Sequence, residues 1–411
     1  MAWWNPFERR SVPPPSSREN FERFGVVTPS AAGVQVTLEN ALGVPAVSAA
    51  VNFIANEIAS LPLNVYRRQA DGRERVNSRL ATLLHDAPND FSTSFELVKG
   101  LFIAKLTGGR GFAYIERASP GGAPVSIWPM DPAKVTVKRD GWTRYYEYSD
   151  GARKLTYAAD EVIDLPFMLM PDGISHKGPI SLGRDAIGLA IAVTQYGSNY
   201  LANGGVPPFA VTGAFQSGAA MKRAADDLAN AVRKAATEQR QALVLPEGID
   251  IKSIGSDPEK SQMVETQRFC VEQIARLYSI PPTFLQDLSH GTFSNTEQQD
   301  LHFVKHTLLH HARQFEQELN LKLFGAKSRS QYVELNMDGL LRGDFKTRME
   351  GWAQAIQSGV AMPSEARQAE NWPMVEGSDQ LFIQGGTMPI GDAGKNSPPA
   401  GTDPAGQGTT P

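Results

Sequence analysis

Cysteine and long apolar runs are nearly absent from this 411-residue chain. The single cysteine, Cys270, excludes any disulfide within the chain and is typical of proteins made in a reducing compartment. The longest aliphatic stretch, residues 186–193, is far shorter than the roughly 20 residues that span a bilayer. The N-terminus also lacks the apolar core of a signal peptide. We therefore expect a protein made in the cytoplasm, with no membrane partner.

The chain also lacks an excess of positive charge. It has 40 Lys and Arg against 44 Asp and Glu, which gives a net charge of −4. A protein that grips nucleic acid needs a basic surface to replace the counterions of the phosphates. The basic pairs Arg67-Arg68 and Lys138-Arg139 are isolated, and such pairs are more typical of solvated surface. The composition argues against tight nucleic-acid binding as the main function.

Catalytic motifs are missing as well. The segment Gly109-Arg110-Gly111 lacks the third glycine of a dinucleotide fingerprint, and no glycine-rich loop has the spacing of a phosphate-binding loop. No serine lies in a nucleophile elbow. Cys270 lies between Phe269 and Val271 in an amphipathic helical pattern, where we expect a small, half-buried hydrophobe and not a nucleophile. We expect no catalytic residue and no cofactor.

Histidines form the one pattern that suggests a metal. His302, His306 and His310 follow each other at intervals of four residues, and two histidines at that interval can share a zinc ion. The glutamate that follows the first histidine of a metalloprotease helix is missing, because Phe303 stands there. We interpret the stripe as a hydrated or partner-facing helix face without metal. A metal-dependent hydrolase that uses this stripe remains the alternative.

Hydrophobic periodicity predicts an α+β domain over residues 40–165. A helix starts at Pro45 and is stopped by Pro62, and a strand and a hairpin turn follow. Thr93 and Glu96 have the spacing of a capping box ahead of the next helix. Between residues 111 and 165, turn signals recur about every ten residues, which predicts an antiparallel meander.

The next segment, residues 179–203, carries only two charges, Arg184 and Asp185. A helix with so little charge is expected to be covered nearly all round. Small residues recur on one side of it and would let a neighbouring helix approach closely: Gly183, Ala186, Ala190 and Gly197.

The rest of the chain predicts an insertion, several helices and a disordered tail. A second amphipathic helix, about 259–278, places Val264, Val271, Ile274 and Tyr278 on one face. The other expected elements are an α+β insertion (209–257), a long helix (296–324), a strand (332–335), two short helices (near 344–357 and 364–370) and a tail rich in Gly and Pro (384–411).

Six segments together form a recognisable series, although none of them is a catalytic signature. In chain order they are Val51–Tyr66, Leu84–Asn89 with Ser94-Phe95 after it, Trp128–Pro132, Tyr200–Gly204, Ile274–Pro282 and Thr292–Glu297. In their number and order, these segments resemble the portal proteins of tailed bacteriophages, in the branch of long-tailed phages and related gene transfer agents. The resemblance covers about residues 40–370. The chain departs from the family where Gly108-Gly109-Arg110 replaces a Gly-Asn pair, and in lacking a proline near His310.

The resemblance implies an α+β, portal-type subunit. Its expected parts are a flexible N-terminal arm (1–30), the first part of an α/β wing (31–178), a stem helix (179–203), a small α+β clip (204–257), a second stem helix (258–279), a tunnel loop (280–295), the second part of the wing with the long helix (296–341), a short helical crown (342–383) and a disordered tail (384–411).

The resemblance also implies a function, which is structural and not enzymatic. Twelve copies would form a ring at one capsid vertex of the virion, assembled after synthesis in the bacterial host cytoplasm. The implied partners are the major capsid protein, the large terminase that drives packaging, the head–tail adaptor and double-stranded DNA passing without sequence specificity. A net charge of −4 suits a conduit that must not hold DNA. Another ring-forming head-to-tail connector is a further possibility.

Two sets of residues would serve this role. Packing between the stems of neighbouring subunits is assigned to Gly183, Ala186, Ala190 and Gly197. The channel lining is assigned to the tunnel loop, by Gln286, Asp287, Leu288, Ser289, His290, Gly291 and Thr292.

Overall fold

The structure is a computed structural model, and it divides into two compact units, residues 1–337 and 338–411. It describes residues 29–70, 72–151, 153–202, 209–213, 217–237, 249–253, 260–285, 296–325, 330–337, 345–370 and 372–382. Residues 1–28 of the predicted arm, 286–295 of the predicted tunnel loop and the whole predicted tail (384–411) lie outside these ranges.

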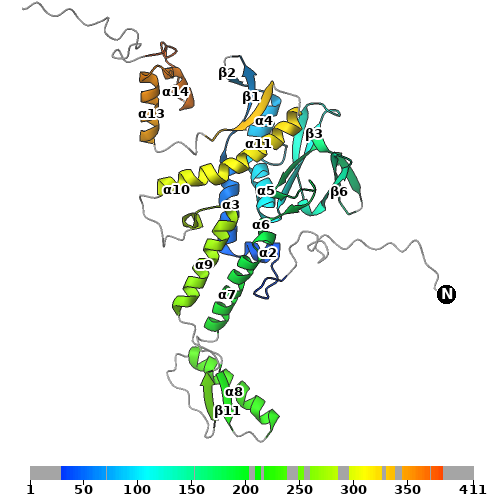
Figure 1. Cartoon of the computed structure of the whole chain (residues 1–411), viewed down its shortest axis with the longest axis vertical. Helices are drawn as coiled ribbons and strands as arrows, with labels where there is room; N and C mark the ends of the chain where they lie inside the picture. The colour runs from blue at the N-terminus through cyan, green and yellow to red at the C-terminus, as the bar shows by residue number, and fades with distance from the viewer. Residues whose placement is uncertain are drawn as a thin grey trace, which may run out of the picture. The chain divides into compact units, whose positions relative to one another are not determined.

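The first unit mixes helices with five small antiparallel sheets, as the α+β prediction requires (Figure 1). The helices are α2 (Leu38–Leu42), α3 (Pro45–Ser60), α4 (Arg79–His85), α5 (Ser94–Thr107), α6 (Pro179–Leu182), α7 (Arg184–Ala202), α8 (Gly218–Thr237), α9 (Lys260–Tyr278), α10 (Thr296–Phe303) and α11 (Leu309–Phe324). The sheets are β13-β1-β2 (Gln331–Leu335, Leu63–Gln69, Gly72–Arg75), β4-β3-β8 (Pro124–Met130, Arg110–Arg117, Val162–Pro166), β5-β6-β7 (Val135–Asp140, Thr143–Ser149, Lys154–Ala158), β9-β10 (Met168–Leu169, His176–Lys177) and β11-β12 (Phe209–Gly213, Ile249–Ser253).

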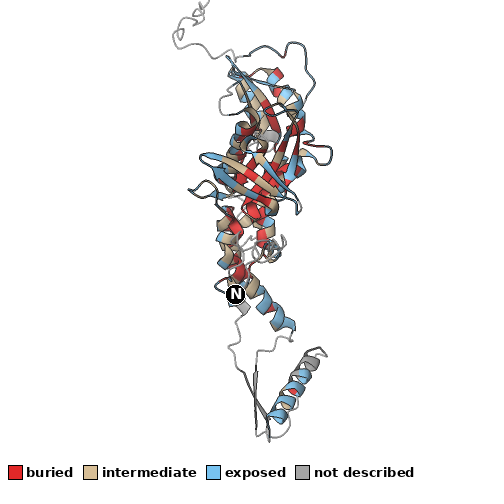
Figure 2. Cartoon of the chain, turned by 90° about the vertical axis from the view of Figure 1, so that its right-hand side faces the viewer, coloured by how far each residue is buried: buried red, intermediate tan, exposed pale blue. Residues whose placement is uncertain are grey.

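Helices α3 and α5 form as predicted and pack on each other in the core. Pro45 occupies the first turn of α3, whose last helical residue is Ser60. The capping box of α5 is present: the Thr93 hydroxyl accepts from the Glu96 amide at 3.2 Å, and the Glu96 carboxylate accepts from the Thr93 amide at 2.9 Å. Figure 2 shows the buried residues gathered around the sheets and their covering helices.

The prediction of one meander between residues 111 and 165 is wrong in its connections. Strands β5, β6 and β7 do form a meander, but β8 leaves it and pairs with β3 in a separate sheet. A buried ion pair accompanies this pairing, because Arg110 on β3 makes two 2.6 Å bonds to Asp164 on β8. The hydroxyl of Tyr146, on β6, donates to the same carboxylate at 2.8 Å and so ties the two sheets together. Burial first, then the charge of Asp164, raises the pKa of Tyr146.

The helix predicted over 296–324 is continuous but not a regular α-helix. A π-helical turn, Val304–Leu308, separates α10 from α11. Beyond it, α11 caps the open edge of strand β13. The Asn320 side chain accepts from the Val333 amide at 2.7 Å and donates to the Val333 carbonyl at 3.0 Å, and Glu316 accepts from the Leu335 amide at 2.9 Å. These bonds occupy backbone groups that an edge strand otherwise exposes to other chains.

A buried lysine joins α5 to α11. Lys105 is fully buried, and its ammonium donates to Gln314 at 2.7 Å and lies 2.9 Å from Nδ1 of His311. Burial lowers the pKa of Lys105 to about 7. Burial, helped by the charge of Lys105, lowers the pKa of His311 to about 3. The histidine is therefore neutral at pH 7 and accepts the bond from the lysine.

The second unit holds the two short helices that the sequence predicts, α13 (Phe345–Gln357) and α14 (Pro363–Ala369). Arg348 on α13 binds Glu370 through two bonds of 2.8 and 3.1 Å, and the Trp352 indole donates to the same carboxylate at 3.3 Å. An ion pair rather than a large apolar core thus links the two helices.

Asn320→Ala tests the edge cap. The change leaves the amide and carbonyl of buried Val333 without partners, so we expect the free energy of unfolding to fall by about 1–3 kcal/mol. Gln317→Ala, at an exposed position one turn earlier on the same helix, is the matched control and should change it by less than about 0.5 kcal/mol. Urea denaturation measures both, and equal effects of the two variants would contradict the capping role.

His311→Gln tests the buried pair through its pH dependence. The unfolded chain binds a proton on His311 below about pH 6.5, whereas the folded chain does so only near pH 3, so stability is lost as the pH falls between these values. Glutamine can accept the bond from Lys105 but does not titrate. The variant should lose less stability than the wild type between pH 6.5 and 4, by up to about 1.4 kcal/mol per pH unit. Gln317→Ala, at an exposed position of the same helix that does not titrate, should leave the pH profile of stability unchanged. The same pH profile for His311→Gln and the wild type would refute the assignment.

Candidate functional site

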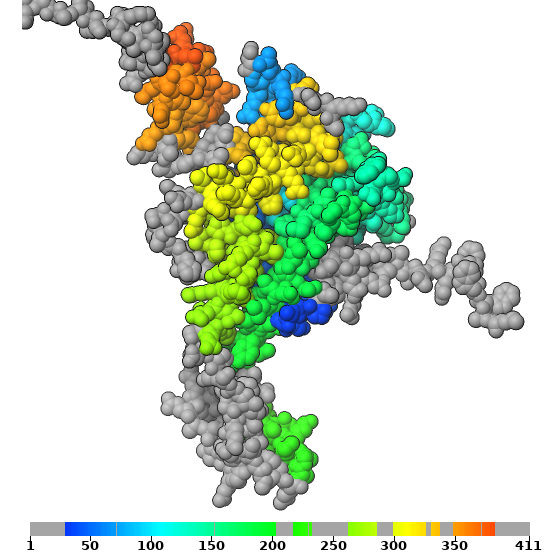
Figure 3. Space-filling model, in the orientation of Figure 1, coloured from blue at the N-terminus to red at the C-terminus, as the bar shows by residue number. Residues whose placement is uncertain are grey.

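Helices α7 and α9 form a hairpin that leaves the sheets of the first unit (Figure 1) and run side by side (Figure 3). Small residues allow them to approach closely. A β-carbon at Gly183 would lie 2.3 Å from a side-chain methyl of Leu277, and one at Gly197 would lie 2.3 Å from the terminal methyl of Met263, so a larger residue at either position would push these α9 side chains aside. The predicted seam therefore has a role within one chain at these two glycines. Its contact with a neighbouring subunit stays a prediction.

The predicted helix over 179–203 differs from the structure in two ways. It breaks at Gly183 into α6 and α7. It is also not covered all round within one chain. Ala190 is buried and Ala186 half-buried, but Tyr196 is 48% exposed and Leu201 is 73% exposed.

Helix α9 follows its predicted pattern in part. Ile274 and Tyr278 are buried, and Cys270, 3% exposed, is more deeply buried than the half-buried position that was expected. Burial raises the pKa of the Cys270 thiol, which makes it a poor nucleophile. Val264, predicted on the same face as Ile274, is instead 47% exposed, and Phe269 is 49% exposed. Each helix of the hairpin thus leaves apolar side chains about half exposed or more.

The histidine stripe does not continue along one helix face. His302 and His306 lie close, with ring centroids 4.3 Å apart, but the π-helical turn intervenes before His310. A π turn bonds residue i to i+5 and so shifts the positions that follow it away from an i, i+4, i+8 line. Among the described residues, no three side chains of His, Cys, Asp or Glu are placed to hold a metal ion. The hydrolase alternative has no ligand set in the part of the chain that the structure describes.

The channel-lining residues of the predicted tunnel loop, 286–292, lie outside the described residues. Both flanks of the loop are described. Phe284 in the 3-10 turn η3 (Pro282–Leu285) and Phe303 on α10 pack against Phe53 on α3, with ring centroids 5.1–5.2 Å apart. The hydroxyl of Thr283 donates to the Gln299 side chain at 2.6 Å. This cluster of three rings at the flanks of the loop was not predicted, because nothing in the local sequence pairs Phe53 with rings some 230 and 250 positions away.

The C-terminal end of α9 is also bonded to the rest of the first unit. Ser279 adopts a left-handed backbone conformation (φ 55°) after the last residue of α9, and its carbonyl accepts from the Thr307 hydroxyl in the π turn. The hydroxyl of Tyr278 donates to the Leu106 carbonyl of α5 at 3.1 Å. The hairpin is therefore anchored at one end by both α5 and the long helix.

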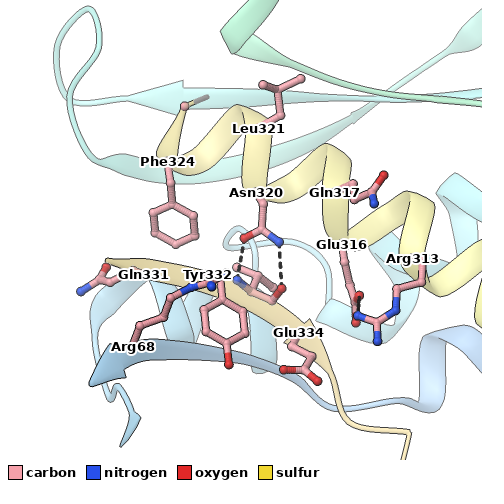
Figure 4. A pocket seen from close by; sticks show the side chains of 12 residues that line it. Arg68, Arg313, Glu316, Gln317, Asn320, Leu321, Phe324, Gln331, Tyr332 and Glu334 are labelled. Carbon is pink, nitrogen blue, oxygen red and sulfur yellow. Dashed lines mark hydrogen bonds and ion pairs between the residues drawn. The ribbon is translucent and has the colours of Figure 1, made fainter. Parts of the chain in front are cut away.

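A groove of about 450 Å³ runs between α11 and strand β13 (Figure 4). Its polar side chains already bond within the chain: Asn320 to the β13 backbone, and Arg313 to Glu316 at 3.0 Å. Figure 4 shows Arg68 and Tyr332 on the opposite wall, where the guanidinium lies 4.9 Å from the ring centroid. No nucleophile with an adjacent base lines this groove, so the residues around it do not make an active site.

No helix in the described ranges has the length and hydrophobicity needed to cross a lipid bilayer.

Comparison with known proteins identifies the family to which this fold belongs. The family model described as phage portal protein matches residues 45–371. The portal protein of Enterobacteria phage HK97 is 27% identical over 367 residues, covering 88% of this chain and 86% of the relative. The probable portal protein of Streptomyces phage phiC31 is also 27% identical, over 387 residues that cover 90% of this chain and 83% of the relative.

Solved structures share the fold. A chain in the neck of a native gene transfer agent particle, computed with C12 symmetry, has a TM-score of 0.56 at 20% identity and covers 87% of this chain and 94% of its own. A crystal structure of an HK97-family portal protein from Corynebacterium diphtheriae has a TM-score of 0.56 at 15% identity and covers 73% and 95%. The chain belongs to the phage portal protein family, a structural and not an enzymatic family of the heads of tailed phages and gene transfer agents.

Proposed function

We propose that twelve copies of this chain form a ring at one vertex of the capsid, through which double-stranded DNA is packaged and later ejected. The observation that carries the proposal is the match of nearly the whole described chain to a subunit in a neck of C12 symmetry. The α7–α9 hairpin supports it, because Tyr196, Leu201 and Phe269 expose apolar surface that packing against a neighbouring copy would bury.

The parts of the chain take different roles in this ring. The sheets with α3, α5 and α11 form the wing, which meets the major capsid protein, and α7 and α9 form the stem. Residues 204–257 are the clip, which receives the large terminase during packaging and the head–tail adaptor afterwards. The unit with α13 and α14 is the crown. The protein reaches the portal vertex of the virion from the bacterial host cytoplasm, and it needs no cofactor or metal.

Mass photometry of the purified protein tests the ring. Twelve copies of the 44.7 kDa chain should appear as a species of about 540 kDa without added nucleotide or metal, because the exposed hairpin faces are complementary surfaces of one chain. A single 45 kDa species at micromolar concentration in both low and high salt would contradict the proposal. An enzyme would instead appear as a monomer or a small symmetric oligomer.

The double substitution Asp287→Lys with His290→Lys tests the channel. The predicted tunnel loop, 286–292, contains no Lys or Arg, so it can approach DNA without binding phosphates. Twelve lysine-bearing loops would form phosphate contacts that must break at every step. We expect rings to assemble normally while packaged DNA per particle falls several-fold.

A matched control separates charge from position. Asp160→Lys with Thr156→Lys adds the same charge at exposed positions on β7 and the turn after it. These changes should leave packaging unaffected. Equal packaging by both double variants would show that 286–292 does not meet the DNA.

A further inference from the structure

The two most exposed large apolar side chains among the described residues are aromatic. Trp142 is 97% exposed and Phe91 is 90% exposed. Neither ring can contact the other within the chain at such exposure. Aromatic side chains presented in this way are the usual anchors of protein interfaces, where tryptophan and tyrosine dominate the binding energy and phenylalanine is enriched.

The loop that carries Phe91 is rigid. The side chain of buried Asn89 accepts from the amides of Phe91 and Ser92 at 2.8 and 2.7 Å and donates to the Ile127 carbonyl at 2.7 Å. The Ile127 amide in turn donates to the Pro88 carbonyl at 2.7 Å. The loop is thus bonded to strand β4 through Pro88 and Asn89, and the backbone at Phe91 is held by Asn89, so less backbone entropy is lost when Phe91 binds a partner.

The turn that carries Trp142 is also rigid. Gly141 and Trp142 form a two-residue connection between β5 and β6, which remain paired up to Asp140 and Thr143. Gly141 has the positive φ (57°) that such a turn requires. Beside the turn, the Arg139 guanidinium donates to the Asp172 carbonyl at 3.1 Å. Trp142 therefore stands at the end of a supported hairpin and not on a loose loop.

The charges around the two aromatic residues are opposite. Residues 85–96, around Phe91, contain three acidic residues and no Lys or Arg. Residues 138–144, around Trp142, contain three basic residues and one acidic residue; Lys138 and Arg144 pair with Glu147 and Asp164, so Arg139 is the cation that this turn presents. Asp90 and Arg139 are both exposed. A closed ring of identical copies needs two different, complementary surfaces on each copy, one for each neighbour. The Phe91 loop and the Trp142 turn have the aromatic side chains and the opposite charges that such a pair of surfaces requires.

We propose that Trp142 of one copy packs against Phe91 of the next copy around the ring, with Arg139 beside Asp90. This contact rests on the proposed ring and adds to it a specific wing-to-wing interface. It is head-to-tail, so each copy uses its Trp142 tip on one side and its Phe91 loop on the other. Offset or edge-to-face ring packing and the opposite charges around it then fix the angle between neighbours.

Cysteine cross-linking tests the contact, because Cys270→Ala removes the only native thiol. In that background, Phe91→Cys and Trp142→Cys are combined in one chain and treated with a short bismaleimide. The linker is needed because a disulfide requires Cα atoms closer than about 7 Å, which is less than two packed aromatic side chains leave. A head-to-tail contact predicts a ladder of covalent products from dimer up to dodecamer on a denaturing gel.

The controls make the result specific. Either cysteine alone should give no ladder, whereas dimers from one single variant would show a symmetric contact and overturn the proposal. Phe91→Cys combined with Leu155→Cys, at an exposed position on β7, should also give none. Rings without a ladder from the Phe91–Trp142 pair would overturn this interface while leaving the ring intact. Absence of rings in the wild type would instead refute the proposed function.

A charge exchange gives a second test that does not remove the aromatic rings. Asp90→Arg and Arg139→Asp should each lower the ring yield at least several-fold at low salt, by placing like charges opposite each other, and the double variant should restore it. This test decides the matter if the cysteine variant assembles poorly. Equal ring yields for the single and double variants would overturn the proposal.

Discussion

The structure depends on helix α11, which follows the α7–α9 hairpin in the chain and packs against the sheets that precede the hairpin. Polar side chains of helix α11 point into the interior, and each makes a hydrogen bond to a group on another helix or strand. Asn320 and Glu316 bond the backbone of β13, Gln314 accepts from Lys105 and donates to Pro166, and Glu318 accepts from the Asp164 amide at 2.9 Å. Without α11, these backbone groups and the buried lysine would lose their partners at about 1–3 kcal/mol each. The sheets that precede the hairpin therefore depend on residues that follow it.

This dependence on α11 explains how the chain can leave the folding unit for more than 100 residues and then return to complete it. The hairpin of α7 and α9 begins after the first sheets and ends at Ser279, where Tyr278 and Thr307 connect it to α5 and to the π turn. Its attached end is fixed by hydrogen bonds and by the rings of Phe53, Phe284 and Phe303. Its helices leave Tyr196, Leu201 and Phe269 about half exposed or more, which suits a part completed by neighbouring copies in the proposed ring.

Local sequence signals predicted the elements whose causes are local. Pro45, the Thr93–Glu96 capping box and the at least partial burial of Cys270 could be derived from spacing and residue type alone. The pairing of β8 with β3 could not, because strand periodicity does not say which strand is the neighbour. Only the opposite charges of Arg110 and Asp164 hinted at it, and many such pairs exist in any sequence. The π turn was missed because residues 304–308 carry no local signal for it, and the bond from the Thr307 hydroxyl to the Ser279 carbonyl joins residues 28 positions apart.

The candidate site, too, was predicted only in part from the sequence. The small residues Gly183 and Gly197 were recognised as a helix-packing seam, but sequence could not tell a partner in the same chain from one in the next. The partly exposed face of α7 shows why. Low charge indicates a surface that will be covered without indicating by what.

The most direct test of this account is an electron cryomicroscopy map of the purified protein without imposed symmetry. The account predicts a twelvefold ring in which the α7–α9 hairpins stand around the central axis, with Tyr196 and Phe269 buried between adjacent copies. A ring in which these hairpins stand apart, with both side chains still facing solvent, would contradict the assignment of the hairpin to the assembly of the portal.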